Sequence, residues 1–306
     1  MAEAAARARP LAQPLRYRLE AAGAWALLGL CRSLPIDAAS ALGGRLGRLA
    51  GRLFAAASRR ADRNLAVALP EIAAAERRRI VAGMWENLGR TVAELGHLDA
   101  LEAAVTGDDR VEVVGAEHLR AAVDSGAGVL FVSAHLGNWE LLPRVFVAVG
   151  GEMGIVHRVA NNPLVEAMVA RARATAGIEL VAKGSEGTRR LIRLIKAGRT
   201  VGMLVDQRFS EGIAAPFFCR PAMTAPTPAE LALRYRLPLL PARSERLDGA
   251  RFRVTILAPL ELPASDDRAA DVLTLTTKIN RLLEGWIRER PEQWLWLHRR
   301  WPEPTC

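Results

Sequence analysis

The stretch GVLFVSAHLGNWELL, residues 128–142, contains the pattern that decides the fold. Its first half is a continuous apolar run, which predicts a buried strand, and its second half has the glycine, asparagine and leucines of a turn into a helix. His135 is then expected at the end of the strand, with Glu140 following across the turn. Ligands of open α/β sheets bind beyond the carboxyl ends of the strands, so the stretch predicts a site at His135.

Further β-rich runs, with helical patterns between most of them, extend this prediction along the chain. Strands that are nearly all apolar and alternate with helices are typical of a largely parallel sheet covered on both faces. We expect an α/β fold with a mostly parallel, mixed sheet flanked by helices over residues 106–306, preceded by helices over 61–105 and closed by a helix over 270–291. The other expected strands are residues 111–115, 154–157, 178–182, 200–206, 237–242 and 252–257.

The composition bounds the kind of protein. A chain of 306 residues, half of them hydrophobic, is long enough to bury a sizeable core. The three cysteines, Cys31, Cys219 and Cys306, have no CxxC or His-paired metal spacing, and their odd number argues against a disulfide framework. We therefore expect a reducing compartment and neither a metal nor a cofactor.

Positive charge is concentrated at the start of the chain. Residues 1–63 hold eleven arginines against four acidic residues, which is +7 of the total net charge of +9. The uncharged run over residues 21–31 is shorter than the roughly 20 residues that a membrane-spanning helix needs. We expect residues 1–60 to form a membrane-associating helical region that is interfacial or re-entrant, the alternative being an ordinary amphipathic core helix whose arginines reach solvent.

The spacing of His135 and Glu140 suggests a base held by a carboxylate. A carboxylate that reaches one imidazole nitrogen selects the tautomer and leaves the other nitrogen free as a base. Gly137 would let the backbone turn tightly, Asn138 would cap the helix, and amides at the helix start would stabilise an oxyanion. The alternative is that His135 is structural, as a histidine at a strand end often is.

Three classes of function follow from these residues. The chain has no GxSxG nucleophile elbow, so a base at His135 is expected to activate a substrate hydroxyl directly. Activation of water, as in a hydrolase, is the second hypothesis. A non-enzymatic binder of nucleic acid or anionic surfaces is the third, but the apolar residues between the arginines and the lack of a helix-turn-helix pattern argue against nucleic acid.

The sequence SAHLGNWE, residues 133–140, resembles the H-x4-D/E signature of glycerolipid-type acyltransferases in the HxGNWE form of the late lipid A biosynthesis acyltransferases. The resemblance runs from about residue 15 to the C-terminus, and related mannolipid acyltransferases share the His/Glu pair. Other stretches resemble that family in the same order: RNLAVALPE (63–71), MWENLGRTVAEL (84–95), HRVANNP (157–163), GMLVDQR (202–208), PFFCRPAMT (216–224) and PEQWLWLHRRW (291–301).

The resemblance is to the lauroyl/myristoyl acyltransferase type of this family. It implies a glycerolipid acyltransferase-like fold over 61–306 and transfer of a fatty acyl chain from an acyl-carrier-protein thioester to a hydroxyl of a lipid A precursor. The basic, apolar N-terminal region and the tryptophan- and arginine-rich C-terminus predict a location at the inner membrane, with the site facing the cytoplasm. The alternative is an acyl-CoA-dependent enzyme acting on another membrane glycolipid, such as a mannosylated phosphoinositide. By resemblance, His135 is the general base and Glu140 its orienting partner. The residues expected to bind substrate are Gly137, Asn138, Arg158, Asn161, Asp206 and Gln207.

Several of these residues also have a plainer interpretation. Arg158 would make a surface ion pair, and Asp206, at the end of the 200–206 run, would cap a turn. Phe217 and Phe218 are expected in an apolar loop that forms an acyl-chain wall or simply joins the core. Three tryptophans near the C-terminus suit either the headgroup layer of a membrane or a packed final strand. They are Trp294, Trp296 and Trp301. The string EGTR, residues 186–189, resembles a phosphate-binding string but precedes its expected strand, so we interpret it as coincidence.

Overall fold

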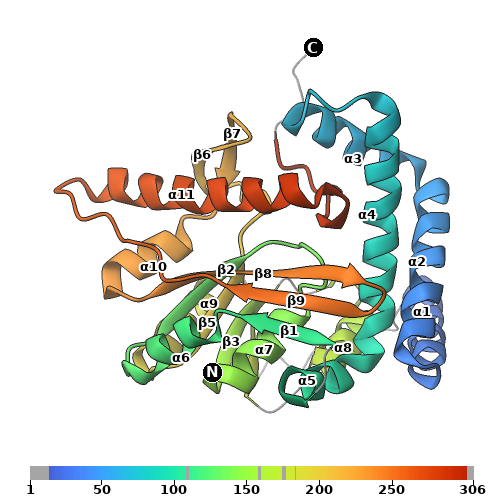
Figure 1. The fold of residues 1–306 in the computed structure, drawn as a ribbon, viewed down its shortest axis with the longest axis horizontal. Helices are drawn as coiled ribbons and strands as arrows, with labels where there is room; N and C mark the ends of the chain where they lie inside the picture. The colour runs from blue at the N-terminus through green and yellow to red at the C-terminus, as the bar shows by residue number, and fades with distance from the viewer. Residues whose placement is uncertain (1–13, 108–109, 158–159, 174–176, 183, 302–306) are drawn as a thin grey trace, which may run out of the picture.

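A computed structural model describes residues 14–107, 110–157, 160–173, 177–182 and 184–301 of the chain. Within these residues the chain folds into helices and a seven-stranded sheet, with a separate hairpin (Figure 1). The helices are α1 Leu15–Ser33, α2 Ile36–Leu53, α3 Ala55–Ala68, α4 Ala74–Glu94, α5 Leu98–Gly107, α6 Ala116–Asp124, α7 Leu141–Gly150, α8 Pro163–Arg173, α9 Ser185–Lys196, α10 Thr227–Tyr235 and α11 Arg268–Glu289. The strands are β1 Val111–Val114, β2 Val129–Ser133, β3 Met153–His157, β4 Ile178–Ala182, β5 Thr200–Leu204, β6 Ile213–Phe217, β7 Arg220–Thr224, β8 Leu239–Asp248 and β9 Arg251–Ile256.

The large sheet is mixed and mostly parallel, which confirms the predicted fold class. Its strand order is β1-β9-β8-β2-β5-β3-β4. All neighbouring pairs are parallel except β8 and β9, which form an antiparallel pair. Each of the seven strands expected from the sequence is present, and the structure shifts their ends by a few residues, most of all at β8.

Both faces of the sheet are covered, as the apolar character of its strands requires. Successive side chains of a strand point to opposite faces, and β2 shows this directly. Leu130 and Val132 join a core that includes residues of α9, α10 and α11, whereas Val129 and Phe131 join a core with α5, α6 and α7. Figure 1 shows α11 along one side of the sheet and α5, α6 and α7 along the other. The sheet is thus buried between two helical layers.

The register of β2 and β5 determines where the site lies. These two central strands are parallel neighbours, and Ser133 of β2 pairs with Leu204 of β5. His135 and Asp206 each lie two residues beyond that pair. Because parallel strands end at the same edge of a sheet, the two side chains emerge side by side.

The hairpin of β6 and β7 was not expected from the sequence. Its strands pair antiparallel over residues 213–217 and 220–224, where we expected an apolar loop. Phe218 and Cys219 form the turn with positive φ angles of 52° and 58°. Left-handed backbone usually favours glycine or asparagine, so the sequence carries no ordinary hairpin signal at this turn. The missed strands follow from that atypical turn.

The N-terminal helices pack against α4 rather than extend away from the fold. The helix α2 lies along α4, with Gly43 and Gly47 of α2 against Gly89 of α4 so closely that a Cβ atom at any of them would collide with backbone atoms opposite. The domain boundary expected at residue 60 falls inside α3. Among the described residues, no helix has both the length and the apolarity to cross a membrane.

The C-terminal tryptophans are buried, which contradicts their expected place in a headgroup layer. Trp294, Trp296 and Trp301 are 2%, 0% and 7% exposed and belong to the core cluster shared with α11 and the sheet. Their rings contact those of Phe217 and Phe218, which are also buried: Trp301 stacks on Phe217, Trp294 meets Phe217 edge-on, and Trp296 is tilted against Phe218. Those two phenylalanines are therefore core residues and do not form a cavity wall. No regular strand forms in this described part of the C-terminal segment, where one isolated bridge joins Leu136 to Trp294.

Candidate active site

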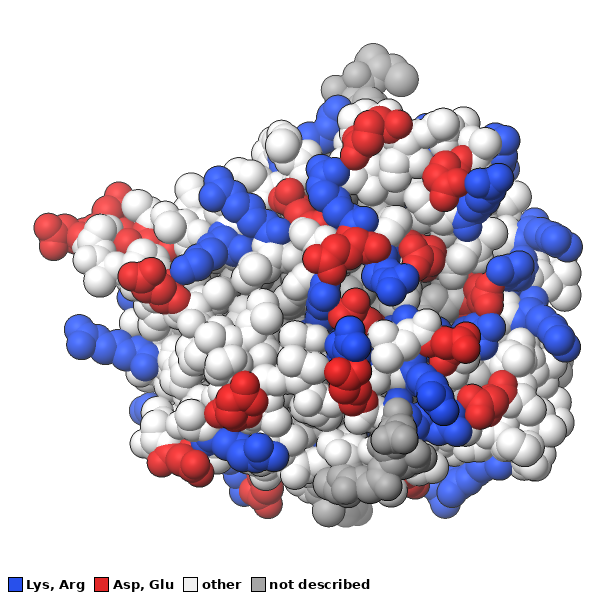
Figure 2. Space-filling model, viewed as in Figure 1, with Lys and Arg blue, Asp and Glu red and all other residues white. Residues whose placement is uncertain are grey.

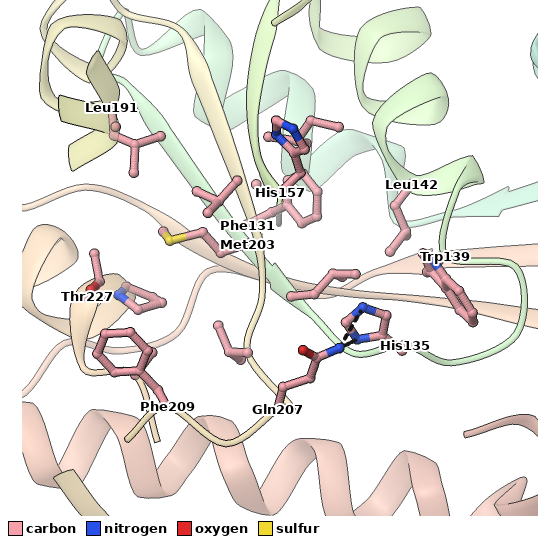
Figure 3. Close-up of a pocket in the computed structure, with 18 of the residues that line it drawn as sticks. Phe131, His135, Trp139, Leu142, His157, Leu191, Met203, Gln207, Phe209 and Thr227 are labelled. Carbon is pink, nitrogen blue, oxygen red and sulfur yellow. Dashed lines mark hydrogen bonds between the residues drawn. The ribbon is translucent and has the colours of Figure 1, made fainter. Parts of the chain in front are cut away.

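A cavity of about 350 Å³ opens beyond the carboxyl ends of β2, β3 and β5, where the sequence predicts a site. Its polar end holds His135 and Gln207, and its walls are mostly apolar (Figure 3). The apolar lining includes Phe131, Leu142, Ile155, Val156, Leu191, Met203 and Phe209. A long apolar chain with one reactive polar end would fit such a space.

His135 is held by Asp206. The Nδ1 atom of His135 lies 2.8 Å from Oδ1 of Asp206, and the backbone amide of His135 donates to Oδ2 over 3.1 Å. A carboxylate can only accept, so Nδ1 carries the proton and Nε2 keeps its lone pair. This is the tautomer that a general base needs at Nε2. Asp206 thus has the part that the sequence interpretation gave to Glu140.

The surroundings of Asp206 keep it ionised. Its side chain is fully buried, and Trp294 donates its indole N–H to Oδ2 over 2.8 Å. Burial alone would raise the pKa of this carboxyl. The charge and hydrogen bonds of His135, together with the Trp294 indole, outweigh burial and hold the pKa well below its usual range. An ionised carboxylate at this position would stabilise positive charge on the His135 ring.

Glu140 is occupied by other partners, which corrects the prediction that it orients His135. The guanidinium of Arg173 donates to both Glu140 oxygens over 2.7 and 2.6 Å, and the Trp139 indole donates over 2.9 Å. Burial opposes the charge of Arg173, yet the Glu140 carboxylate raises the Arg173 pKa above its ordinary value. The Trp139 ring in turn meets the His135 ring edge-on, with centroids 5.2 Å apart. Glu140 is thus linked to the histidine indirectly, through Trp139.

The turn between His135 and α7 is fixed by the helix α4. Gly137 has a φ of +57°, and a Cβ there would collide with the backbone carbonyl of Ser244 in β8, so the prediction of a tight glycine turn is confirmed. Asn87 donates to the Gly137 carbonyl over 2.9 Å. Asn138 is fully buried and donates to Glu94 over 2.8 Å. Residues of the stretch 84–95 thus hold the backbone of the turn that follows His135.

Two predicted roles change as a result. Gly137 and Asn138 were expected to bind substrate, but their contacts serve the turn, and neither lines the cavity. Asn138 was also expected to cap a helix that contains Glu140. It does accept the Glu140 amide over 3.2 Å, but α7 begins only at Leu141. A buried ion pair between Glu94 and Arg246 of β8 completes the support of this turn.

Gln207 joins His135 to a second histidine. Its Nε2 atom lies 3.2 Å from Nε2 of His135 and 2.7 Å from Nε2 of His298. With the amide in this orientation, both imidazole nitrogens accept, since an amide nitrogen only donates. Gln207 therefore lines the cavity as predicted, in direct contact with Nε2 of His135.

The C-terminal segment brings His298 to the site. Asn64 of α3 donates to the carbonyls of Trp296 and His298 over 2.8 and 2.6 Å. Nearby, burial lowers the pKa of Arg300 to about 10, while the charge of Asp206 opposes that shift. The sequence interpretation did not assign His298 to the site. His298 lies in the stretch 291–301 that the sequence analysis singled out, but nothing in the sequence indicates that this segment folds back to the end of β2.

The remaining predicted residues do not gather at the cavity. Arg158 lies outside the described residues. Asn161 is exposed and does not line the cavity. Its neighbour Asn162 is buried and accepts the Leu164 amide at the start of α8. The block HRVANNP thus contributes His157, which does line the cavity, rather than Asn161.

The string EGTR, interpreted as coincidence, does reach the site. Gly187 and Thr188, at the start of α9, both line the cavity beside Ala182. No group of His, Cys, Asp or Glu side chains in the described ranges is arranged to hold a metal ion.

The chain matches the family model described as bacterial lipid A biosynthesis acyltransferase over residues 9–303. It is 28% identical over 284 residues to the lipid A biosynthesis lauroyltransferase of Escherichia coli (strain K12), covering 90% of this chain and 88% of that protein. Identity to the lipid A biosynthesis myristoyltransferase of the same organism is 28% over 260 residues, covering 83% and 77%. A phosphatidylinositol mannoside acyltransferase of Mycobacterium tuberculosis is 26% identical over 199 residues, covering 63% and 60%.

Proposed function

The chain belongs to the family of bacterial lipid A biosynthesis acyltransferases, and on this premise we propose that it transfers a fatty acyl chain from an acyl-carrier-protein thioester to a hydroxyl of a lipid A precursor. Membership makes it an O-acyltransferase. The observation that carries the proposal is the pairing of His135 with buried Asp206 at the polar end of an apolar cavity.

The reaction needs one base and no covalent enzyme intermediate. Nε2 of His135 removes the proton of the acceptor hydroxyl as its oxygen attacks the thioester carbonyl carbon. The new C–O bond forms, the tetrahedral intermediate collapses, and the C–S bond breaks. The leaving thiolate then takes the proton from His135, so that both the proton and the charge are returned. Throughout, Asp206 holds Nδ1 and balances the positive charge of the imidazolium.

Gln207 and Glu140 have supporting parts in this proposal. The Gln207 amide occupies the place beside Nε2 that the acceptor hydroxyl must take, so the hydroxyl displaces it or joins it there. Glu140 acts as a positioning residue, since it holds Arg173 and Trp139 in the cavity wall next to the base. The apolar walls take the acyl chain of the donor.

We propose acyl carrier protein, which is acidic, as the donor because positive charge lies at the cavity. Arg208 is exposed, lines the cavity, and has no ion-pair partner among the residues that the structure describes. Contacts between opposite charges weaken as salt is added. Transfer from the carrier thioester should therefore fall more steeply with ionic strength than transfer from the coenzyme A thioester. Equal salt dependence, or a preference for coenzyme A, would count against the carrier protein.

The proposed location is the cytoplasmic face of the inner membrane. Apolar side chains of α1 are strongly exposed, with Leu15 at 71%, Leu19 at 64% and Leu30 at 50%. Figure 2 shows basic side chains along the edge of the molecule formed by α1 and α2, at the right of the view. Replacing all three leucines with serine should move protein from the membrane fraction to the supernatant. An unchanged distribution after this replacement would argue against α1 as an anchor.

One experiment separates the candidate reactions. The purified protein is incubated with acyl-carrier thioester, with and without a lipid A precursor. Acyl transfer only with the precursor supports the proposal, and thioester loss without it indicates a hydrolase. A mannosylated phosphoinositide is the second acceptor to test, because the mannoside acyltransferase relative shares part of this chain. Mass spectrometry of lipid A from cells that lack and then regain the protein identifies the acylated product.

A further inference from the structure

A second cavity, of about 450 Å³, lies between α2, α3 and α4 and shares no lining residue with the active site. We call it the arginine pocket. Its lining includes Trp85 and five arginines: Arg48, Arg52, Arg59, Arg77 and Arg78. Nothing in the proposed reaction uses this cavity.

The charge of the pocket is only partly balanced. Arg48 pairs with Glu86 and Arg77 pairs with Asp62. In the chain as described, no ion pair is made by the other three arginines of the lining, Arg52, Arg59 and Arg78. Three guanidinium groups around one hollow have fifteen N–H donors that suit the oxygens of a phosphate.

The floor of the pocket is rigid. Trp85 is 8% exposed and donates its indole N–H to Ser58 over 2.9 Å, while the Ser58 hydroxyl donates to the Gly51 carbonyl over 2.6 Å. The Phe54 ring stacks on Trp85 with centroids 6.2 Å apart. These contacts hold the floor between α2, α3 and α4, and Arg52, Arg59 and Arg78 are exposed around it.

Three exposed apolar residues lie next to the pocket residues, and we call them the apolar rim. Leu49 and Leu53 each follow a pocket arginine in the chain, and the Phe54 ring stacks on Trp85. Leu49, Leu53 and Phe54, at the end of α2 and the start of α3, are 49%, 72% and 60% exposed. Free phosphate and nucleic acid gain nothing from such a rim. A phospholipid has both parts, since its phosphate faces arginine while its glycerol and upper acyl chains meet apolar side chains.

We propose that the arginine pocket binds the headgroup phosphate of an anionic phospholipid, at a site separate from the active site. The choice of ligand rests on the proposed membrane location. The test is independent of acyl transfer, because binding is measured with neither donor nor acceptor present. A protein that proves inactive in the transfer assay can still bind this lipid, and the reverse also holds.

Calorimetry on the full chain tests the proposal with dihexanoyl phosphatidylglycerol below its micelle concentration. Dihexanoyl phosphatidylcholine and inorganic phosphate are the comparison ligands. We expect saturable binding of phosphatidylglycerol, weakened about tenfold or more in the double variant Arg52→Gln/Arg78→Gln. The lysine double variant at the same positions keeps the charge and should retain most of the binding. Equal binding of phosphatidylcholine would overturn the proposal, as would phosphate alone binding as tightly as the lipid.

Arg120→Gln/Arg281→Gln is the matched control. These exposed arginines of α6 and α11 lie outside both cavities, and their replacement removes the same charge. The control should bind phosphatidylglycerol like the unmodified protein. If the control and the pocket variant lost phosphatidylglycerol binding equally, the loss would reflect net charge alone. That result would overturn the proposed binding at the arginine pocket. Matching thermal unfolding of all variants ensures that lost binding does not reflect lost folding.

Discussion

Two carboxylates lie near His135, and they come from two different regions of the molecule. Glu140 belongs to the turn after β2, only five residues from the histidine, whereas Asp206 follows β5 and is 71 residues away. The nearer residue in sequence binds Arg173, and the farther one binds the imidazole. Strand register thus decides which carboxylate contacts His135, and sequence proximity does not.

The largest effect should come from the base itself. General-base catalysis contributes about 10² to 10⁴-fold, so His135→Ala should lose at least that much in kcat/KM. Circular dichroism and thermal unfolding must show an intact fold. Transfer at a near-normal rate by a folded His135→Ala protein would make the histidine structural and end the proposed mechanism.

The second effect tests which carboxylate orients the base. Asp206→Asn keeps the size but offers His135 a neutral amide, which no longer favours the Nδ1–H tautomer or balances the imidazolium. We expect kcat/KM to fall about 10² to 10³-fold, a loss smaller than that of His135→Ala. The double variant should be little worse than His135→Ala, because the two groups act as one unit. Fully additive losses would contradict a functional pair.

A smaller effect is expected in the turn. Glu140→Gln removes the charge that holds Arg173 and loosens the wall around Trp139, while the His135–Asp206 contact stays. We expect a loss of about 10 to 10²-fold in kcat/KM, similar to that of Arg173→Gln, with little further loss in the double variant. If Glu140→Gln were as damaging as Asp206→Asn and independent of Arg173, Glu140 would regain its predicted place beside the base.

The smallest effect should come from the bridge between the two histidines. Gln207→Leu removes the amide that donates to His135 and His298 but keeps the bulk of the side chain. We expect less than about a tenfold change, seen in KM for the acceptor more than in kcat, since Gln207 only occupies the place of the hydroxyl. His298→Gln serves as the comparison, and a loss approaching that of Asp206→Asn in either variant would make the bridge part of the base.

Some features could not be read from the chain, and each has a local reason. The hairpin of β6 and β7 turns through Phe218 and Cys219, which are poor indicators of left-handed backbone. The C-terminal tryptophans flank a run of basic residues, 298–300, as in a membrane belt, yet they pack inside against Phe217 and Phe218. A local sequence pattern does not show whether a large apolar side chain packs against the core or faces a membrane. Arg300 is buried as well and donates to the Thr224 hydroxyl, whereas its neighbour Arg299 is exposed.

The sequence alone determined the α/β class, the positions of the main strands and the placement of His135 at a strand end, because apolar runs and turn residues are local signals. It also indicated Gln207 as a cavity residue and Gly137 as a turn. Only the tertiary structure decided that Asp206 holds His135, since that contact depends on β2 and β5 being parallel neighbours in one register. Hydrogen bonds between distant segments depend on how the strands pair, and no spacing along the chain records that pairing.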